Sequence, residues 1–372
     1  MSSCFHQVDW GVVNQNSVAC AEIYSHNVKL KNITVDTGQP KFERPLIGIR
    51  DGGSHVPAQR DVSIFNTCFS CVYPFCFDGF KRFPSHLSIQ PRLWSKENSI
   101  ENVIIFKKAI ITSRYDDHNP FFQLSLLLNA WISHGHIGSN STIMVFGEKI
   151  VQNIDILWER VFGGKIMYTS DLPKRFRVNE AWFIRSEYVG PMMQHLNDFQ
   201  PCRKSKMIVD FFDHCCKAMS VIPVQSVLPI ITFIRRKKYA VRKRMRIITR
   251  ILMNEEYIID ETQRLLSHYE VRGLYMEDLT QQLQIQKMRE SRVVIGMHGA
   301  GMVNVAFMKP DVSNVIEIFP QNKRRYGYRN LCQYLKINYM EFRKGRDTTD
   351  DNKIITLAEW RHYLLQSNAN WY

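Results

Sequence analysis

The chain has 372 residues, 45% of them hydrophobic, which is enough for two domains that each bury a core. It contains no apolar run of about 18 residues and no amino-terminal segment with a basic flank and an apolar centre, so the sequence as written predicts neither a membrane-spanning protein nor a signal peptide. The formal net charge of +14 favours an anionic partner, and nucleotide sugars, acidic glycans, nucleic acids and anionic membranes all meet that description.

The first hundred residues differ in pattern from the rest. Residues 1–100 alternate short apolar runs with turn-rich stretches such as TGQPKFERP and RDGGSHVP, and this pattern predicts strands and long loops rather than helices. We expect the region to pack on the domain that follows it.

Two further stretches alternate strands with helices. Residues 101–205 and 206–345 are each predicted to form an α/β domain, with parallel sheets covered by helices on both faces. The expected strands are 103–106, 109–112, 142–146, 230–234, 271–275, 293–295, 316–320 and 337–342. The expected helices are 123–132, 154–162, 207–219, 254–268, 279–290 and 328–335. Residues 346–372 are left as a C-terminal tail.

The segment SRVVIGMHGAGMVNVAFMKPDVSNVIEIFP, residues 291–320, joins a buried strand, a glycine-rich turn, a helix and a second buried strand. Its glycines allow a sharp turn and bring backbone N–H groups and the start of the next helix close to an anion. His298 lies inside the turn, where its imidazole can donate a hydrogen bond to a phosphate oxygen without a metal ion. The spacing differs from the GxGxxG fingerprint, so a nicotinamide cofactor is not indicated. The alternative is a tight turn with a surface histidine.

Within that segment, GMHGAGMVNVAFM followed by VIEIFP resembles the signature of glycosyltransferase family 61, which includes the plant core β-1,2-xylosyltransferase and the EGF-domain-specific O-linked N-acetylglucosamine transferase. The resemblance continues upstream through EDLTQQLQIQKMRESRVVIG, ITFIRR and TRILMNEEYI, and more weakly through SRYDDHNPFFQLSLLLNAW, so it spans roughly residues 114–342. It implies a GT-B fold, in which two Rossmann-like domains with parallel sheets face a central cleft. It also implies inverting transfer of a sugar of the GlcNAc or xylose class from a UDP donor to a hydroxyl group of a glycan or glycoprotein.

The basic run RRKKYAVRKRMRIITR, residues 235–250, leaves the carboxyl end of a predicted strand, where open α/β sheets bind ligands. By similarity to the family, Arg236 would clamp a diphosphate, with Arg235 as the alternative in register, and Arg250 would occupy a second basic position near the nucleotide. The resemblance gives the same diphosphate role to the turn residues His298, Gly299, Ala300 and Gly301. A solvated loop or a patch that binds nucleic acid or another polyanion is the alternative for the run.

Glu317 is an acid at the end of an otherwise apolar strand, a costly position unless the carboxylate finds partners. Ribose hydroxyl groups are suitable partners, so we expect Glu317 to contact the nucleoside. The alternative is a structural carboxylate paired with an arginine or with backbone N–H groups.

The expected acceptor side departs from the family. Its members resembling the plant enzyme carry an aromatic–His pair and, four residues after the histidine, an aspartate; aligned on Asn119, the positions here are Phe122 and Leu126. Inverting transfer needs a general base, and Asp116, which matches a family glutamate, and His118 are the candidates that remain. A run of Asp-Asp-His is also a good turn. The loss of two polar groups favours, as an alternative, a noncatalytic relative that binds nucleotide sugars or glycans.

Compartment and metal content follow from weaker signals. The resemblance implies the lumen of the endoplasmic reticulum or Golgi, with membrane association only through an amino-terminal anchor outside this sequence. Nucleic acid is not an expected partner, and neither a cofactor nor a metal ion is expected if cationic side chains neutralise the leaving diphosphate. The cysteines number nine, and three of them lie together without a second pair at ligand spacing, which favours a disulfide or buried thiols over zinc: Cys68, Cys71 and Cys76.

Overall fold

The computed structural model describes residues 21–23, 27–36, 63–66, 104–113, 119–138, 140–146, 153–173, 175–184, 190–193, 204–222, 226–237, 239–241, 246–248, 250–321, 323, 325–348, 351–368 and 371. Contacts between these residues divide the chain into two compact units, one ending at Met193 and one containing the described residues from 204 onwards. No helix in the described part of the chain is both long enough and apolar enough to cross a bilayer.

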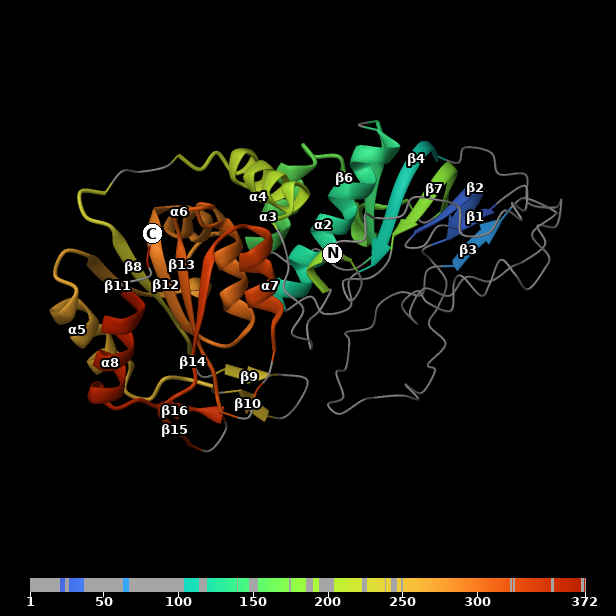
Figure 1. Ribbon diagram of the computed structural model, residues 1–372. Helices are drawn as coiled ribbons and strands as arrows, with labels where there is room; N and C mark the ends of the chain where they lie inside the picture. The colour runs from blue at the N-terminus through green and yellow to red at the C-terminus, as the bar shows by residue number, and fades with distance from the viewer. Residues whose placement is uncertain are drawn as a thin grey trace. The chain divides into compact units, whose positions relative to one another are not determined.

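The C-terminal unit is built on a five-stranded, fully parallel sheet in the order β11-β8-β12-β13-β14 (Figure 1). Its strands are β8 (Ile230–Arg235), β11 (Glu270–Tyr275), β12 (Ser291–Met297), β13 (Asn314–Ile318) and β14 (Asn338–Phe342). The central strands are buried almost throughout, because helices cover both faces of the sheet. This explains why they read in the sequence as continuous apolar runs.

Two helices cover one face of this sheet, α5 (Glu255–Leu265) and α8 (Leu357–Asn368), which lie side by side in Figure 1. Phe233 and Ile295 from the sheet pack there with Ile258 and Trp360 from the helices. Other helical elements of the unit pack on one another, and the rings of Phe212 and Phe307 from two of them meet edge to face. They are α4 (Lys206–Ala218), α6 (Gln281–Glu290), η5 (Ala300–Phe307) and α7 (Gly327–Tyr334).

The segment expected as a C-terminal tail is folded into the C-terminal unit. The described residues here form β15 (Arg346–Asp347), β16 (Lys353–Ile354) and α8, and Ile355, Trp360 and Leu364 belong to the core of the unit. Trp360 and Leu364 are fully buried, and the indole of Trp360 donates a hydrogen bond of 2.8 Å to the Thr262 hydroxyl. The apolar spacing of Leu357, Trp360 and Leu364 is the helical signal that the sequence contained.

The N-terminal unit contains a sheet of mixed direction, in the order β1-β2-β7-β4-β5-β6, with β3 paired to β2. Its strands are β1 (Ala21–Ile23), β2 (Asn27–Asp36), β3 (Ser63–Asn66), β4 (Ile104–Ser113), β5 (Thr142–Phe146), β6 (Ile166–Tyr168) and β7 (Arg175–Ile184). The four strands from β7 to β6 are parallel, whereas β1, β2 and β3 add antiparallel pairs. The parallel order expected for this domain therefore holds for one side of its sheet.

In the described part of the N-terminal unit the α-helices are α2 (Pro120–Ile137) and α3 (Asn153–Val161). Asn119 begins α2 by accepting a hydrogen bond of 3.1 Å from the backbone N–H of Phe121, and proline follows as the first helical residue. The two strands expected at 103–106 and 109–112 are one strand, β4. Both units thus have parallel strands joined by helices, and the predicted α/β, Rossmann-like class is confirmed.

Candidate functional site

The parallel sheet of the C-terminal unit has a point where its connections change direction. In the chain, β8 is followed by β11 on one side of it, whereas β12 lies on the other side of β8 and is followed by β13 further out. The carboxyl ends of β8 and β12 therefore flank a topological switch point, where open α/β sheets bind ligands. Arg236 follows β8 directly and His298 follows β12 directly.

Arg236 bridges these two strand ends. Its Nη1 donates a hydrogen bond of 2.8 Å to the backbone carbonyl oxygen of His298. Arg235 has a different environment: its Nε donates to Glu255 at 2.8 Å, it pairs with Glu256, and its guanidinium lies 4.7 Å from the centre of the Tyr275 ring. The geometry therefore places Arg236, and not Arg235, against the turn.

Side chains pack closely on two glycines here, Gly296 near the end of β12 and Gly299 in the turn between β12 and η5. A Cβ on Gly299 would lie 1.8 Å from Nη1 of Arg236, and one on Gly296 would lie 2.6 Å from the Met302 sulfur. The backbone of Gly299 is extended, with φ of 168°, so its requirement is for space and not for an unusual conformation. The segment after it, expected as a helix, is the 3₁₀ helix η5, whose third residue Met302 donates a hydrogen bond to the Gly299 carbonyl.

The imidazole of His298 is held on three sides. Its Nδ1 lies 2.5 Å from Oε1 of Glu317, its ring stacks on Phe319 with centroids 4.8 Å apart and planes 18° apart, and the edge of Tyr328 approaches it at 5.9 Å. The side chain of His298 is 15% exposed. One orientation of the ring is thus fixed, with Nδ1 directed at the carboxylate.

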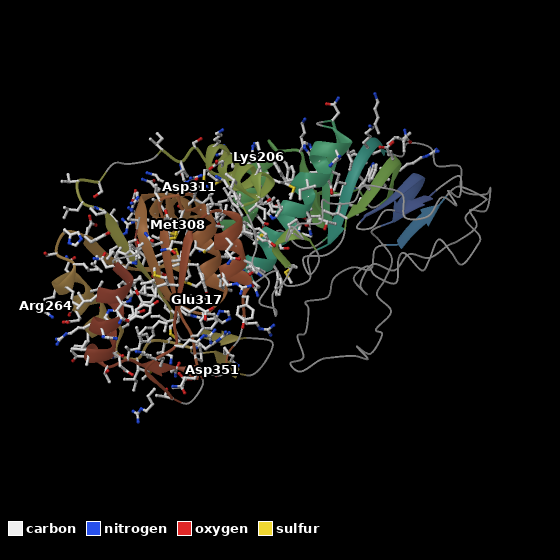
Figure 2. All side chains as sticks on the ribbon, in the orientation of Figure 1. Lys206, Arg264, Met308, Asp311, Glu317 and Asp351 are labelled. Atoms are coloured by element: carbon white, nitrogen blue, oxygen red, sulfur yellow. The ribbon has the colours of Figure 1, made fainter. Side chains whose placement is uncertain are left out.

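Glu317, the expected ribose ligand, is buried. Its side chain has no exposed surface, and Figure 2 shows it inside the C-terminal unit. One carboxylate oxygen faces His298, and the other accepts a hydrogen bond of 2.6 Å from the Tyr339 hydroxyl. The partners that satisfy the buried carboxylate are therefore protein side chains, as in the structural alternative for this residue, and contact with a nucleoside stays a prediction.

Two tyrosines complete the surroundings of this pair. The hydroxyl of Tyr328 donates a hydrogen bond of 2.8 Å to the carbonyl oxygen of Gly299, which ties α7 to the turn. Burial raises the pKa of Tyr328, the charge of Glu317 adds to the rise, and the guanidinium groups of Arg236 and Arg250 oppose it. Burial and the same carboxylate also raise the pKa of Tyr339. Both arginines therefore act electrostatically on the same buried hydroxyl.

Arg250 is held in a conformation that few non-glycine residues adopt, with φ of +42°. The residues after it are fixed by the C-terminal segment: Asn352 accepts a hydrogen bond from the Ile251 N–H at 2.9 Å, and the Lys353 N–H donates to the Ile251 carbonyl at 3.0 Å. Asn254 adds two more hydrogen bonds, to the N–H and carbonyl of Ile355. We call residues 351–355 the C-terminal strap. A strained residue fixed by surrounding structure is a mark of functional sites.

The expected acceptor side is only partly described. Asp116 and His118 lie outside the described residues. Of the two positions that depart from the family, Phe122 is half-buried and Leu126 is fully buried in α2. Because Leu126 is fully buried, an aspartate in its place would need a partner inside the unit. The helix packs around an apolar side chain at this position.

Phe319, Tyr328 and Tyr339 were not expected at the site. The place of Phe319 could have been predicted, because it lies two residues after Glu317 in the expected strand 316–320 and therefore on the same face. Tyr328 and Tyr339 had none, because their contacts depend on how α7 and β14 dock against β13.

Among the described residues, no three His, Cys, Asp or Glu side chains are grouped so that they could hold a metal ion. Cys215, Cys216 and Cys332 are free and buried, and Cys68, Cys71 and Cys76 lie outside the described residues.

Comparison with known families gives one match. The family described as Glycosyltransferase 61 matches residues 86–316, more than half of the chain. The matched range begins before the expected residue 114 and includes Arg236, Arg250 and the turn 298–301; it ends one residue before Glu317. No curated protein sequence matches the chain.

Proposed function

This chain belongs to glycosyltransferase family 61, and on that premise we propose that it transfers a sugar from a UDP donor to a hydroxyl group of a glycan or glycoprotein, with inversion at the anomeric carbon. Family membership supports glycosyl transfer in general. The observation that supports a nucleotide diphosphate donor is the hydrogen bond between Arg236 and the backbone of His298 at the switch point of the parallel sheet.

The diphosphate would be held by fixed positive charge and backbone donors. Arg236 and Arg250 supply guanidinium groups that remain charged at every accessible pH, and residues 299–301 supply backbone N–H groups at the start of η5, whereas the N–H of His298 donates to the Ile318 carbonyl. A guanidinium next to the bond that breaks stabilises the negative charge that develops on the leaving diphosphate. We therefore propose that transfer needs neither a metal ion nor another cofactor.

The acceptor hydroxyl must lose a proton as it attacks the anomeric carbon. Asp116 and His118, close to the start of α2, are our candidates for the base. The donor sugar is proposed to be of the GlcNAc or xylose class, as the resemblance to the family implies. We place the reaction in the lumen of the endoplasmic reticulum or Golgi for the same reason.

The test is binding of UDP to the purified chain, measured by calorimetry and by the shift in melting temperature, with and without a chelator. We expect an equal shift in both conditions. His298→Ala should weaken UDP binding by about 1.5 to 3 kcal/mol, the usual worth of a hydrogen bond to a charged group. His268→Ala, which removes an exposed histidine after α5, is the matched control and should bind UDP as the parent does.

Three results would each contradict part of the proposal. Absence of UDP binding would remove the nucleotide site, and loss of the thermal shift with chelator would show that a metal ion is required. Equal UDP affinity in the His298→Ala variant and the parent would show that the histidine does not contact the nucleotide.

A second candidate is a noncatalytic relative that binds the nucleotide sugar but transfers nothing. The observation that favours it is the apolar pair Phe122 and Leu126, where relatives resembling the plant enzyme carry polar groups. A transfer and hydrolysis screen over UDP-xylose, UDP-N-acetylglucosamine and UDP-arabinose separates the two candidates. Binding of UDP without turnover of any donor would support the noncatalytic one.

A further inference from the structure

Glu317 leaves His298 one nitrogen with which to bind a ligand. Nδ1 is occupied by the carboxylate at 2.5 Å, so only Nε2 can meet a phosphate. A phosphate oxygen accepts hydrogen bonds, and Nε2 must therefore carry a proton to contribute to binding. Whether it does depends on how many protons the two side chains hold together.

The pair has two forms that differ by one proton. If Nδ1–H faces an ionised Glu317, neutral His298 has a lone pair on Nε2, and the pair carries one negative charge that is buried with the carboxylate. If the pair holds one more proton, it is neutral overall, as an imidazolium with a carboxylate or as a neutral imidazole with a carboxylic acid, and Nε2 carries a proton in both cases.

Burial and the ligand favour the same form. The carboxylate of Glu317 has no exposed surface, and an isolated buried charge is costly. The protonated pair removes that charge and presents the donor that the phosphate needs, whereas the deprotonated pair presents a lone pair and a net negative charge to an anion.

Other groups around the pair keep their charge over the range in which this proton would be exchanged. Burial raises the pKa of Tyr328, of Tyr339 and of Cys332, so all three stay neutral. The arginines stay charged. The neighbouring titratable and charged groups are, element by element, Arg236 after β8, Arg250 before α5, Tyr328 and Cys332 on α7, and Tyr339, Glu341 and Arg343 on and after β14, with Arg343 on the Phe319 ring that His298 stacks on.

We propose that Glu317 and His298 act as one proton-binding unit whose neutral, protonated form presents Nε2–H to the diphosphate, so that nucleotide binding is coupled to uptake of a proton. This rests on the proposed UDP site. Glu317 is then a positioning residue, which sets the charge and orientation of the histidine without contacting the ligand. Because the bound form holds the extra proton, UDP affinity falls as pH rises, by at most about tenfold per pH unit for one proton.

The experiment is calorimetric titration of the purified chain with UDP between about pH 7 and 8.5, above the second phosphate ionisation near pH 6 and below the ionisation of the uracil N3–H, so that the ligand itself does not titrate. Each pH is measured in two buffers of different ionisation enthalpy, which gives the number of protons taken up per UDP. For the parent we expect affinity to fall with pH and uptake to rise towards one proton.

The variant Glu317→Gln separates this role from a structural one. A glutamine can donate its amide to Nδ1 and accept from Tyr339, which leaves Nε2–H on a neutral imidazole at every pH. We therefore expect Glu317→Gln to bind UDP with an affinity independent of pH and without proton uptake, and to bind more tightly than the parent at the upper end of the range. Glu290→Gln, which removes a nearly buried carboxylate paired with Arg272 on the same unit, should keep the pH profile of the parent.

The outcomes are distinct. UDP binding by the parent with constant affinity and no proton uptake overturns this inference and leaves the nucleotide site intact. A Glu317→Gln variant that is folded, yet keeps the pH dependence of the parent or binds more weakly by the same factor at every pH, also overturns it. Absence of UDP binding at every pH overturns the proposed site and this inference with it.

Discussion

Arg236 donates a hydrogen bond to the backbone carbonyl oxygen of His298 across 62 residues of sequence, and the guanidinium fills the space where a side chain on Gly299 would lie. The contact joins the end of β8 to the turn after β12. The guanidinium of Arg236 can occupy this position only because residue 299 has no Cβ atom.

Gly299→Ala should displace the guanidinium of Arg236, because the new Cβ would lie 1.8 Å from Nη1. We expect UDP affinity to fall by about 1.5 to 3 kcal/mol, the worth of a hydrogen bond to a charged group, with little change in the free energy of unfolding. Gly135→Ala, in α2 and outside the proposed site, is the control, since no atom lies within 4 Å of its Cβ. Calorimetry on both variants checks this, and equal losses in the two would contradict it.

Arg235 and Arg236, adjacent in sequence, should give opposite phenotypes. Arg236→Gln should weaken UDP binding and leave stability near that of the parent. Arg235→Gln should leave Glu255 without its partner and lower the free energy of unfolding by about 1 to 3 kcal/mol, with UDP affinity nearly unchanged. Chemical denaturation gives the free energy of unfolding of each variant, and calorimetry gives its UDP affinity. If Arg235→Gln lost UDP affinity and Arg236→Gln did not, the diphosphate contact would belong to Arg235.

Glu261 should contribute to stability in a pH-dependent way. Hydrogen bonds from Arg264 and Arg361 lower the pKa of Glu261 to about 2, below its usual value near 4.5. A carboxylate with a lowered pKa in the folded state stabilises that state above its unfolded pKa and loses the effect as pH falls through the folded value. The difference in unfolding free energy between the parent and Glu261→Gln should therefore be constant above about pH 5 and shrink towards pH 2.

The control for this measurement is Asp260→Asn, one residue earlier and exposed on α5. It removes the same charge without the two arginine contacts. A stability difference for Glu261→Gln that is unchanged between neutral pH and pH 3 would contradict the assignment.

The base can be tested at the two candidate positions. Asp116→Asn or His118→Ala should reduce transfer by about 10² to 10⁴, the range for a lost general base, because the acceptor hydroxyl then keeps its proton. UDP affinity should barely change. Rapid transfer that survives both substitutions would place the base elsewhere in the chain.

Much of the C-terminal unit was predictable because its strands are buried on both faces and its helices are amphipathic. The strand expected at 230–234 is β8, and the helix expected at 207–219 is α4, each within one residue. The short strands β9 (Tyr239–Val241) and β10 (Arg246–Ile248) were not foreseen, since three residues in a basic run have no readable period.

The elements that carry the site could be predicted from the sequence, but the contacts between their side chains could not. The glycine turn and the strand-terminal arginines follow from local sequence, but the choice between Arg235 and Arg236 depends on which side chain Glu255 pairs with, 20 residues away. The protein partners of Glu317 could not be identified from the sequence for a related reason. A buried acid on a strand indicates that a partner exists, whereas the identity of that partner depends on the docking of β12 and β14 beside β13.

The C-terminal strap has a consequence for the nascent chain. The hydrogen bonds from Asn254 to Ile355 and from Ile251 to Asn352 each span 101 residues, so the segment after Arg250 leaves the ribosome long before its partners are made. At about 5 to 20 residues per second, roughly 5 to 20 seconds separate the two events. During that interval the backbone of Arg250 lacks the contacts that hold its left-handed conformation. The diphosphate end of the sheet is therefore completed only after residue 355 has been made.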